Sequence, residues 1–398
     1  MLKTITCSLW FIIMKKILFV IESLVCAGAE KSLVTLLNLI DYSKYEVDLQ
    51  LFSLTGEFLP LVPQKVNILD ELPYFKETHN SLKSMVFKRK TTYQRKVIKS
   101  RLAYSLSLRI KKYTNPQQAV IFWKYASKCF EIYNKDYDIA IAYAQGVPTF
   151  YVADCINAKK KIAWVNSIYT LESYYNRFAL CKYQNYDKIV CVSESGQQNF
   201  VLSFSSINTK TTVIYDINDG KFIEKLSKND SSAASEMSGE IKLLTIGRFA
   251  IQKGYDIALG ACKILKSRGF KFFWYVLGQG PLESEIINRI RKFNIEDNFI
   301  LLGVRSNPYP YINNADIYVQ TSRFEGFGLA IAEARILNIP VVTTNFDSVY
   351  AQMINGENGL VVDMTPEAVA DGIQKLIEDK ELYNHIVEYQ KSEKKRQL

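Results

Sequence analysis

The sequence predicts an α/β protein built from two doubly wound parallel-sheet domains that face a cleft. Three observations lead to this prediction. The chain has 398 residues, which is too long for one ordinary domain and suits two. Hydrophobic residues make up 48% of the sequence, enough to fill two cores. Finally, each half opens with the same pattern, in which a short apolar run, a glycine-containing loop and a helical pattern follow one another.

The first half begins with the apolar run Lys16–Ile21, which predicts a buried strand. The loop E-S-L-V-C-A-G-A-E follows it, and Lys31–Ile40 then has the apolar spacing of a helix. Further buried strands are predicted at Val47–Phe52, Ile139–Tyr143, Lys161–Val165 and Lys188–Val192. Because helical stretches separate most of these runs, we expect a parallel sheet with right-handed crossovers.

The second half repeats this order with the strand Lys242–Ile246, the loop G-R-F-A-I-Q-K-G and the helical pattern Tyr255–Lys266. Further strands are predicted at Phe272–Leu277, Ile300–Leu302, Ile317–Gln320, Pro340–Thr343 and Leu360–Val362. The polar, Ser-rich segment Lys228–Glu240 predicts a linker between domains 1–227 and 241–398. Both domains are therefore expected to be Rossmann-like, with ligands beyond the carboxyl ends of the strands.

The amino terminus and the cysteines bear on where the protein works. Lys15 and Lys16 interrupt the apolar stretch 9–25, so neither piece approaches the roughly 20 apolar residues of a membrane-spanning helix. We expect Met14 to be the true start and residues 1–13 to be a non-essential extension. Seven cysteines without a C-x-x-C pair are typical of a reduced, cytoplasmic protein. With only two histidines, a histidine-based zinc site is not expected.

A strongly cationic insert lies between Lys76 and Lys128. It contains 14 Lys and Arg residues and one acidic residue, a net charge of +13, whereas the whole chain carries +10. Apolar residues recur there at helical spacing, namely Leu82, Val86, Tyr93, Val97, Tyr104 and Leu108. The part from Leu102 to Ile110 also alternates as a strand would.

The cationic insert has three interpretations. It can be a solvated pair of surface helices, a surface that docks on an anionic membrane, or a nucleic-acid site. The membrane is favoured, because each Lys or Arg near an anionic leaflet contributes about 1 kcal/mol. No nucleic-acid-binding motif accompanies the charge, so no nucleic-acid partner is expected. We therefore expect peripheral association with the cytoplasmic face of the inner membrane through residues 76–128.

The most informative stretch is Q-T-S-R-F-E-G-F-G-L-A-I-A-E-A, residues 320–334. A helix is predicted to begin near Gly328, where exposed amide groups attract phosphate. Glu325 and Glu333 lie on either side of this start, and carboxylates accept hydrogen bonds from hydroxyls. Such a site suits a nucleotide sugar, which has a phosphate core and hydroxylated rings. The alternative is that Ser322 and Glu325 form a capping box and that Glu333 is an ordinary exposed helix residue.

A second candidate site is the loop I-G-R-F-A-I-Q-K-G, residues 246–254. Gly247 ends a predicted strand, and Arg248 and Lys253 are cations on the loop that follows. Arginine offers a planar fork of donors and lysine a mobile point charge, a suitable pair for a leaving diphosphate.

These motifs together resemble those of the family 4 glycosyltransferases, retaining enzymes with the GT-B fold. The resemblance covers nearly the whole chain. It is carried in the second half by IGRFAIQKGYD, ADIYVQTSRFEGFGLAIAEARILNIPVVTT and INGENGLVV, and in the first half by CAGAEK and IVCVSESGQQNF. It implies catalytic roles for Arg248, Lys253 and Glu325. It implies donor-binding roles for Gly28, Asn166, Gly247, Phe327, Gly328, Leu329 and Glu333.

The resemblance also implies an activity: transfer of a sugar from a UDP- or GDP-sugar to a hydroxyl of a lipid-linked saccharide, in the assembly of cell-surface polysaccharide or lipopolysaccharide. A hexosyltransferase of this kind needs no metal cofactor. Three departures from the family pattern stand out, with Asn166 in place of His, Asp216 in place of Asn and Ala27 in place of Gly.

Three rival functions remain open at this point. The departures are compatible with a catalytically weak member that binds a lipid-linked glycan or a partner enzyme. Asp136 and Asp138 fit the D-x-D pattern of a metal-dependent sugar transferase, although they lie at the start of a predicted strand. A basic nucleic-acid binder is the third.

Overall fold

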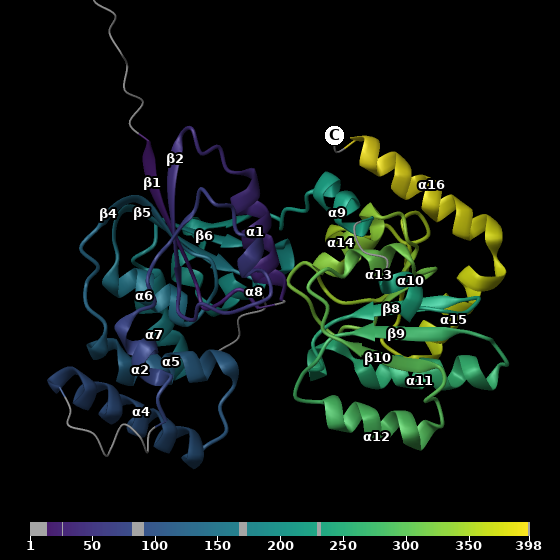
Figure 1. Ribbon diagram of the computed structural model, residues 1–398, viewed down its shortest axis with the longest axis horizontal. Helices are drawn as coiled ribbons and strands as arrows, with labels where there is room; N and C mark the ends of the chain where they lie inside the picture. The colour runs from purple at the N-terminus through teal and green to yellow at the C-terminus, as the bar shows by residue number, and fades with distance from the viewer. Residues whose placement is uncertain (1–13, 26, 82–90, 167–172, 229–231, 397–398) are drawn as a thin grey trace, which may run out of the picture.

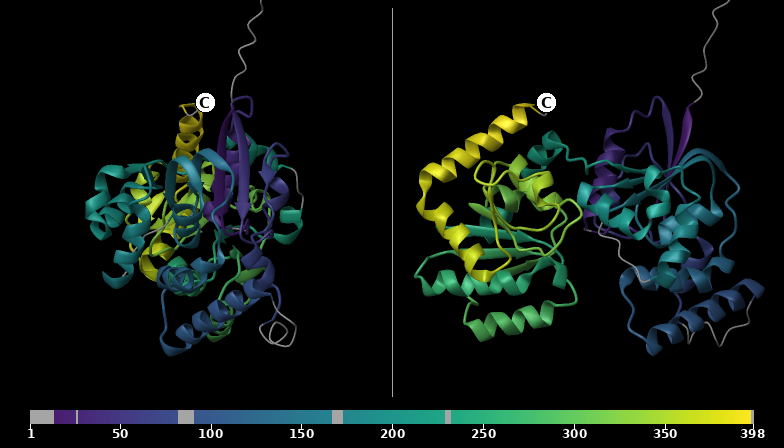
Figure 2. Two further views of the ribbon diagram at one scale, coloured as in Figure 1. Left: turned by 90° about the vertical axis from the view of Figure 1, so that its left-hand side faces the viewer. Right: turned by 180° about the vertical axis from the view of Figure 1, so that it is seen from behind.

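The computed structural model describes residues 14–25, 27–81, 91–166, 173–228 and 232–396. Figure 1 shows two α/β domains side by side, and the view from behind in Figure 2 shows the same division. The predicted extension 1–13 and the predicted stripe residues Leu82 and Val86 lie outside the described residues.

The first domain contains a parallel sheet in the order β3-β2-β1-β4-β5-β6-β7. Its strands are β1 (Lys15–Ile21), β2 (Tyr45–Leu51), β3 (Asn67–Ile68), β4 (Asp136–Ala142), β5 (Asn157–Val165), β6 (Lys188–Cys191) and β7 (Thr211–Val213). All the predicted strands of this half are confirmed. The strands β3 and β7 were not predicted, because two or three residues carry no periodicity.

Both faces of this sheet are covered, and β1 shows why its sequence is continuously apolar. Leu18 and Val20 belong to the core on one face, whereas Ile17, Phe19 and Ile21 belong to the core on the other. The covering helices are α1 (Gly28–Leu39), α2 (Pro73–Thr78), α4 (Thr92–Ile110), α5 (Asn115–Ala126), α6 (Val147–Cys155), α7 (Ser173–Tyr183) and α8 (Glu194–Ser203). Short 3₁₀ turns are η1 (Leu59–Leu61), η2 (Ser127–Cys129) and η3 (Ser205–Lys210).

The second domain repeats the architecture with the parallel order β10-β9-β8-β11-β12-β13. Its strands are β8 (Lys242–Ile246), β9 (Phe273–Leu277), β10 (Phe299–Gly303), β11 (Ile317–Gln320), β12 (Val341–Thr344) and β13 (Leu360–Val362). Its helices are α9 (Gly220–Ser227), α10 (Ser232–Glu236), α11 (Tyr255–Ser267), α12 (Glu283–Phe293), α13 (Tyr309–Asn313), α14 (Leu329–Ile336), α15 (Pro366–Glu378) and α16 (Lys380–Arg396), with the turns η4 (Ile251–Lys253) and η5 (Val349–Ala351). Each strand predicted in this half is found.

The chain passes from one domain to the other between β7 and α9. Ile223 of α9, Ala233 of α10 and Met237 are buried in a core cluster of the second domain. The crossing segment is therefore 214–219, ahead of the linker that composition suggested. The reason is that a few small or flexible apolar side chains suffice to pack an otherwise polar, Ser-rich segment.

The described part of the cationic insert, residues 76–81 and 91–128, is mostly helical and packs outward from the first sheet. Thr91 and Gln94 form a capping box at the start of α4, and Val97 and Ile98 of α4 are buried against Tyr74 and the end of α5. This packing makes Leu102–Ile110 helical and removes the strand interpretation. Figure 1 and Figure 2 show α4 at the outer end of its domain. No helix among the described residues is both long and apolar enough to cross a bilayer.

Candidate active site at the junction of the domains

The candidate site lies where the strand order of the second sheet changes direction. The chain winds outward from β8 in one direction and from β11 in the other. The loops that follow these two strands therefore border a crevice at their carboxyl ends, where doubly wound sheets bind ligands. The loop after β8 carries Gly247 and Arg248, and the loop after β11 carries Glu325. Topology thus brings together the two motifs that the sequence indicated.

Glu325 is held by a network of buried donors. Its Oε1 accepts hydrogen bonds from Ser322 Oγ at 2.5 Å and from Gln320 Nε2 at 2.9 Å, and Lys253 Nζ lies 2.6 Å away. Only 8% of Glu325 is exposed. A carboxylate fixed from three directions keeps one orientation, which is what a group that positions a sugar hydroxyl requires.

The capping-box interpretation of Ser322 and Glu325 is wrong. The residue that precedes α14 is Gly328, and no side chain caps this helix. The Ser322–Glu325 contact joins two side chains within the loop before the helix. Glu333 is not an ordinary surface residue either, because it is 2% exposed.

Two glycines of this loop are required for different reasons. Gly328 has a φ of +88°, a backbone conformation that glycine adopts without strain. Gly326 is in close contact with the first domain, since a Cβ built on it would lie 2.1 Å from the carbonyl oxygen of Asn166. The lack of a side chain at Gly326 therefore admits the backbone of the other domain.

A neighbouring turn supports the same loop from behind. Gln352 Nε2 donates to the carbonyl oxygens of Phe327 and Gly328, and Ser348 Oγ donates to the carbonyl oxygen of Glu325 at 2.9 Å. These bonds leave the amides at the start of α14 free to face a ligand. Sequence reasoning missed both residues, because no local pattern marks a contact between segments more than 20 positions apart.

The two cations of the first loop have different surroundings. Lys253 is ion-paired with Glu325, and its methylene groups lie beside Gly247, where a Cβ would approach them to 3.2 Å. Arg248 is exposed, and its guanidinium makes no hydrogen bond or ion pair with residues that the structure describes. Arg248 can therefore turn toward a ligand without breaking an existing contact.

The first domain reaches this site through the start of α1. Lys31 Nζ is ion-paired with Glu333 Oε1, and a Cβ on Gly28 would lie 3.4 Å from Leu329 Cδ1. Burial raises the pKa of the Glu333 carboxyl, and the charge of Lys31 partly offsets this rise. Although burial disfavours the charge of Lys31, the carboxylate of Glu333 outweighs it and raises the pKa of the ammonium. Sequence reasoning did not assign a role to Lys31.

Two of the three departures from the family pattern also lie at this junction. Asn166 Nδ2 donates to the carbonyl oxygen of Tyr143 at 2.7 Å, and its Oδ1 is buried without a partner among the described residues. Asp216 accepts a hydrogen bond from Ser32 Oγ at 2.6 Å, and burial raises the pKa of its carboxyl to about 6. Ala27 precedes α1 in an extended conformation that any residue adopts, so glycine is not needed there.

Phe327 completes the contact between the domains. Its ring lies 5.7 Å from that of Tyr215, between ring centres, and packs against the core of the first domain. The predicted site residues thus come from both domains and meet at one junction. Figure 1 shows α1 on the side of the first domain that is turned toward α9 and α14.

The D-x-D pair lies elsewhere. Asp138 is near the start of β4, where it accepts a hydrogen bond from the Lys16 amide at 2.9 Å and pairs with Lys159 at 2.6 Å. This is the amino end of the sheet, opposite the site. Among the residues that the structure describes, no group of three or more His, Cys, Asp and Glu side chains could hold a metal ion.

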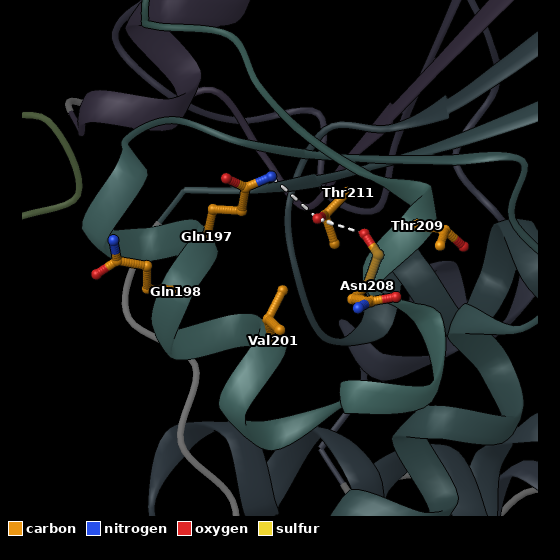
Figure 3. Close-up of a pocket in the computed structure, with 6 residues that line it drawn as sticks. All are labelled: Gln197, Gln198, Val201, Asn208, Thr209 and Thr211. Carbon is orange, nitrogen blue, oxygen red and sulfur yellow. Dashed lines mark hydrogen bonds between the residues drawn. The ribbon is translucent and has the colours of Figure 1, made fainter.

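A cavity of about 300 Å³ lies away from this junction, beside the edge strand β7 (Figure 3). It is lined by Gln197, Gln198, Val201, Asn208, Thr209 and Thr211. None of the predicted site residues contributes to it.

Comparison with known proteins bears on the family and the fold. Residues 227–393 match the sequence model of the family described as glycosyl transferases group 1. The carboxyl-terminal domain is therefore similar to this family. The match is consistent with the more specific resemblance to family 4, which stays a prediction.

Two curated relatives illustrate the similarity. The capsular polysaccharide biosynthesis glycosyltransferase CapM of Staphylococcus aureus is 28% identical over 49% of this chain and 53% of its own length. A second relative is the N-acetylgalactosamine-N,N'-diacetylbacillosaminyl-diphospho-undecaprenol 4-alpha-N-acetylgalactosaminyltransferase of Campylobacter jejuni. It is 26% identical over 50% of this chain and 53% of its own length. The chain thus matches about half the length of these relatives.

Solved structures extend the likeness to both domains. The Anabaena protein HepE in complex with UDP-glucose superposes with a TM-score of 0.69 at 17% identity, covering 96% of this chain and 95% of that one. WaaG, a glycosyltransferase involved in lipopolysaccharide biosynthesis, gives a TM-score of 0.59 at 15% identity, with 95% of each chain covered. At this identity the likeness concerns the fold alone, and it confirms the predicted GT-B architecture.

Proposed function

We propose that the protein is a retaining glycosyltransferase that moves a sugar from a UDP- or GDP-sugar to a hydroxyl of a lipid-linked saccharide. The observation that carries this proposal is the junction itself. There Glu325 is fixed by Ser322, Gln320 and Lys253, beside the start of α14 and Glu333. Two carboxylates that can accept hydrogen bonds from hydroxyls lie on either side of cations and backbone amides that can bind phosphate. A nucleotide sugar offers hydroxyls and phosphates in this arrangement.

In the proposed complex each group has one task. Glu333 accepts hydrogen bonds from the ribose hydroxyls, and Glu325 accepts them from hydroxyls of the transferred sugar. Arg248 and Lys253 neutralise the diphosphate, together with the amides near Gly328. The HepE structures with UDP and UDP-glucose support a UDP-sugar as the first donor to test.

In the proposed reaction, negative charge develops on the departing diphosphate. The bond between the anomeric carbon and the diphosphate oxygen breaks, and the acceptor hydroxyl forms a new bond on the same face of the sugar. The acceptor proton passes to the departing phosphate, so a protein base is not needed. Preorganised positive charge on the diphosphate supplies most of the lowering of the barrier. Arg248 and Lys253 take the place of a metal cofactor in this mechanism.

The acceptor and the setting are proposed from the relatives. The Campylobacter relative is named for transfer to a saccharide on diphospho-undecaprenol, and CapM for capsular polysaccharide biosynthesis. We propose a lipid-linked acceptor of the same kind, in the assembly of cell-surface polysaccharide or lipopolysaccharide. The alternative is a catalytically weak relative, because Asn166 can bind a hydroxyl but cannot carry a proton.

A panel of UDP- and GDP-sugars tests the donor and the function together. We expect one donor to raise the melting temperature of the protein, and radiolabelled sugar from it to enter a lipid-linked saccharide. Glu333→Ala should abolish the shift, because the ribose loses its acceptor. Glu357→Ala, which removes an exposed carboxylate of the same domain, is the control. The absence of a shift with every donor would contradict the proposal, and binding without transfer would favour the weak relative.

The exposed side of α4 supports the proposed membrane partner. Leu102, Leu106 and Ile110 are 51%, 60% and 77% exposed, and they follow one another at spacings of four on the helix. The exposed cations Arg95, Lys96, Lys99 and Arg109 lie on or beside the same face. Four cations near an anionic leaflet contribute about 4 kcal/mol, and the aliphatic side chains can enter the interface. We propose that this face docks the protein on the cytoplasmic side of the inner membrane.

Sedimentation with lipid vesicles tests this docking. We expect binding to vesicles containing phosphatidylglycerol but not to pure phosphatidylcholine, and less binding as salt rises. Leu106→Asp should weaken binding by about tenfold, because it removes an apolar contact and adds repulsion. Leu202→Asp changes a leucine on α8 that is 84% exposed and should have no effect. Equal binding of the Leu106→Asp variant would contradict this docking face.

A further inference from the structure

Two helices from different domains, α1 and α14, face each other at the site. Gly28 and Lys31 are three positions apart on α1, and Leu329 and Glu333 are four positions apart on α14, so each pair lies on one side of its helix. Gly28 lies against Leu329. One turn further along each helix, Lys31 is ion-paired with Glu333. The two helices therefore touch at two successive turns, and the ion pair joins the two domains.

The Lys31–Glu333 pair is shielded from water. The side chains are 18% and 3% exposed, respectively. The ring of Tyr309 lies 4.3 Å from Lys31 Nζ and stabilises the cation from a second side. Removing one partner of such a pair leaves a buried charge without compensation, which is strongly unfavourable. The pair therefore favours the arrangement in which the domains are in contact.

The next residue of α1 makes a second connection. Ser32 Oγ donates to Asp216 in the segment that crosses to the second domain, and Ser32 Oγ also lies 2.9 Å from the hydroxyl of Tyr143. The start of α1 is thus attached both to α14 and to the crossing segment. A movement of α1 away from α14 has to break the ion pair, whereas Ser32 can keep its contact with the crossing segment.

We propose that Lys31 and Glu333 form an interdomain latch that competes with the nucleotide for one carboxylate. This inference rests on the proposed function, in which Glu333 accepts hydrogen bonds from the ribose. Because Lys31 is ion-paired with Glu333, the ribose binds only after this pair has separated. Nucleotide binding is therefore coupled to separation of Lys31 from Glu333, and the latch weakens the apparent affinity by the fraction of molecules in which this ion pair is closed.

The variant Lys31→Met tests the latch by removing the charge while keeping the length of the side chain. Small-angle X-ray scattering of the empty protein should give a larger radius of gyration for Lys31→Met than for the wild type. Calorimetry should give a dissociation constant for UDP, or for GDP if the donor panel selects it, that is lower by about 3- to 10-fold. Lys31→Arg keeps the ion pair and should restore both wild-type values, which excludes a general folding defect.

Lys44→Met is the matched control. Lys44 forms an exposed ion pair with Asp41 at 2.8 Å within the first domain, so its loss should change neither measurement. An unchanged radius of gyration for Lys31→Met would overturn the latch, whether or not a nucleotide binds. Weaker nucleotide binding by Lys31→Met would also overturn it, since Lys31 would then be a contact of the ligand. A wild type that binds no nucleotide refutes the proposed function, while the scattering comparison still decides whether the ion pair holds the domains.

Discussion

Replacing Lys253 by methionine is expected to lower kcat/KM for sugar transfer by about 100- to 1,000-fold. This is the usual effect of removing one preorganised group that stabilises developing negative charge. Lys253 also pairs with the buried Glu325 at 2.6 Å, so its loss leaves that carboxylate without a cation. The variant should therefore show a lower melting temperature as well as a slower reaction. Initial rates with the selected donor, together with a melting curve, measure both effects.

Two further variants separate chemistry from structure in this experiment. Arg248→Ala should lower kcat without lowering the melting temperature, because Arg248 is exposed and its guanidinium makes no hydrogen bond or ion pair with described residues. Arg323→Met removes a cation that pairs with Asp256 at 2.7 Å next to the same loop, and it should leave kcat within a few-fold of the wild type. A Lys253→Met variant with wild-type kinetics would show that this lysine is structural and would contradict the site assignment.

The substitution Gly326→Ala is expected to lower kcat by about 100-fold with little effect on the stability of either domain. A Cβ at this position would lie 2.1 Å from the carbonyl oxygen of Asn166, closer than a Cβ and a non-bonded oxygen can approach. The clash is with backbone, so the loop and the first domain must move apart by about 1 Å. A misplacement of that size at a site shared by two domains costs about two orders of magnitude in rate.

The control for this substitution is Gly220→Ala. Gly220 begins α9 near the same junction, and a Cβ there would meet only Ile336 at an ordinary distance of 3.7 Å. Steady-state kinetics and UDP binding on both variants distinguish the effects. Gly326→Ala should lose turnover while the second domain still binds nucleotide. Wild-type turnover in Gly326→Ala would mean that the close approach of the domains is not part of the reaction.

The strands show how much of the fold can be predicted from local sequence. Strands such as β1 are buried on both faces, so an apolar run bounded by polar residues marks them without knowledge of their neighbours. The edge strands β3 and β7 are too short for such a signal. The helical state of Leu102–Ile110 was ambiguous for another reason, because tertiary packing of Val97 and Ile98 decided it.

In the candidate site, too, some residues could be predicted from local sequence and others could not. Glu325 and Gly328 lie within one stretch of sequence, and their spacing relative to a predicted helix start indicated a phosphate and sugar site. The residues that fix this loop, Gln352 and Ser348, come from a different turn and carry no local mark. In the sequence, Lys31 is one polar residue of an amphipathic helix and nothing marks it as part of the site. Its role is visible only in the folded structure, where it is ion-paired with Glu333.

The sequence by itself determined the two parallel sheets, the loops that hold the candidate site and the concentration of charge in the insert. These features follow from periodicity, glycine placement and composition, which are properties of neighbouring residues. Only the tertiary structure decided where the chain crosses between domains, which face of α4 is exposed and which partner neutralises Glu333. Such features depend on distances between segments far apart in the chain, and the energy of a buried ion pair or a steric contact exists only once folding has brought them together.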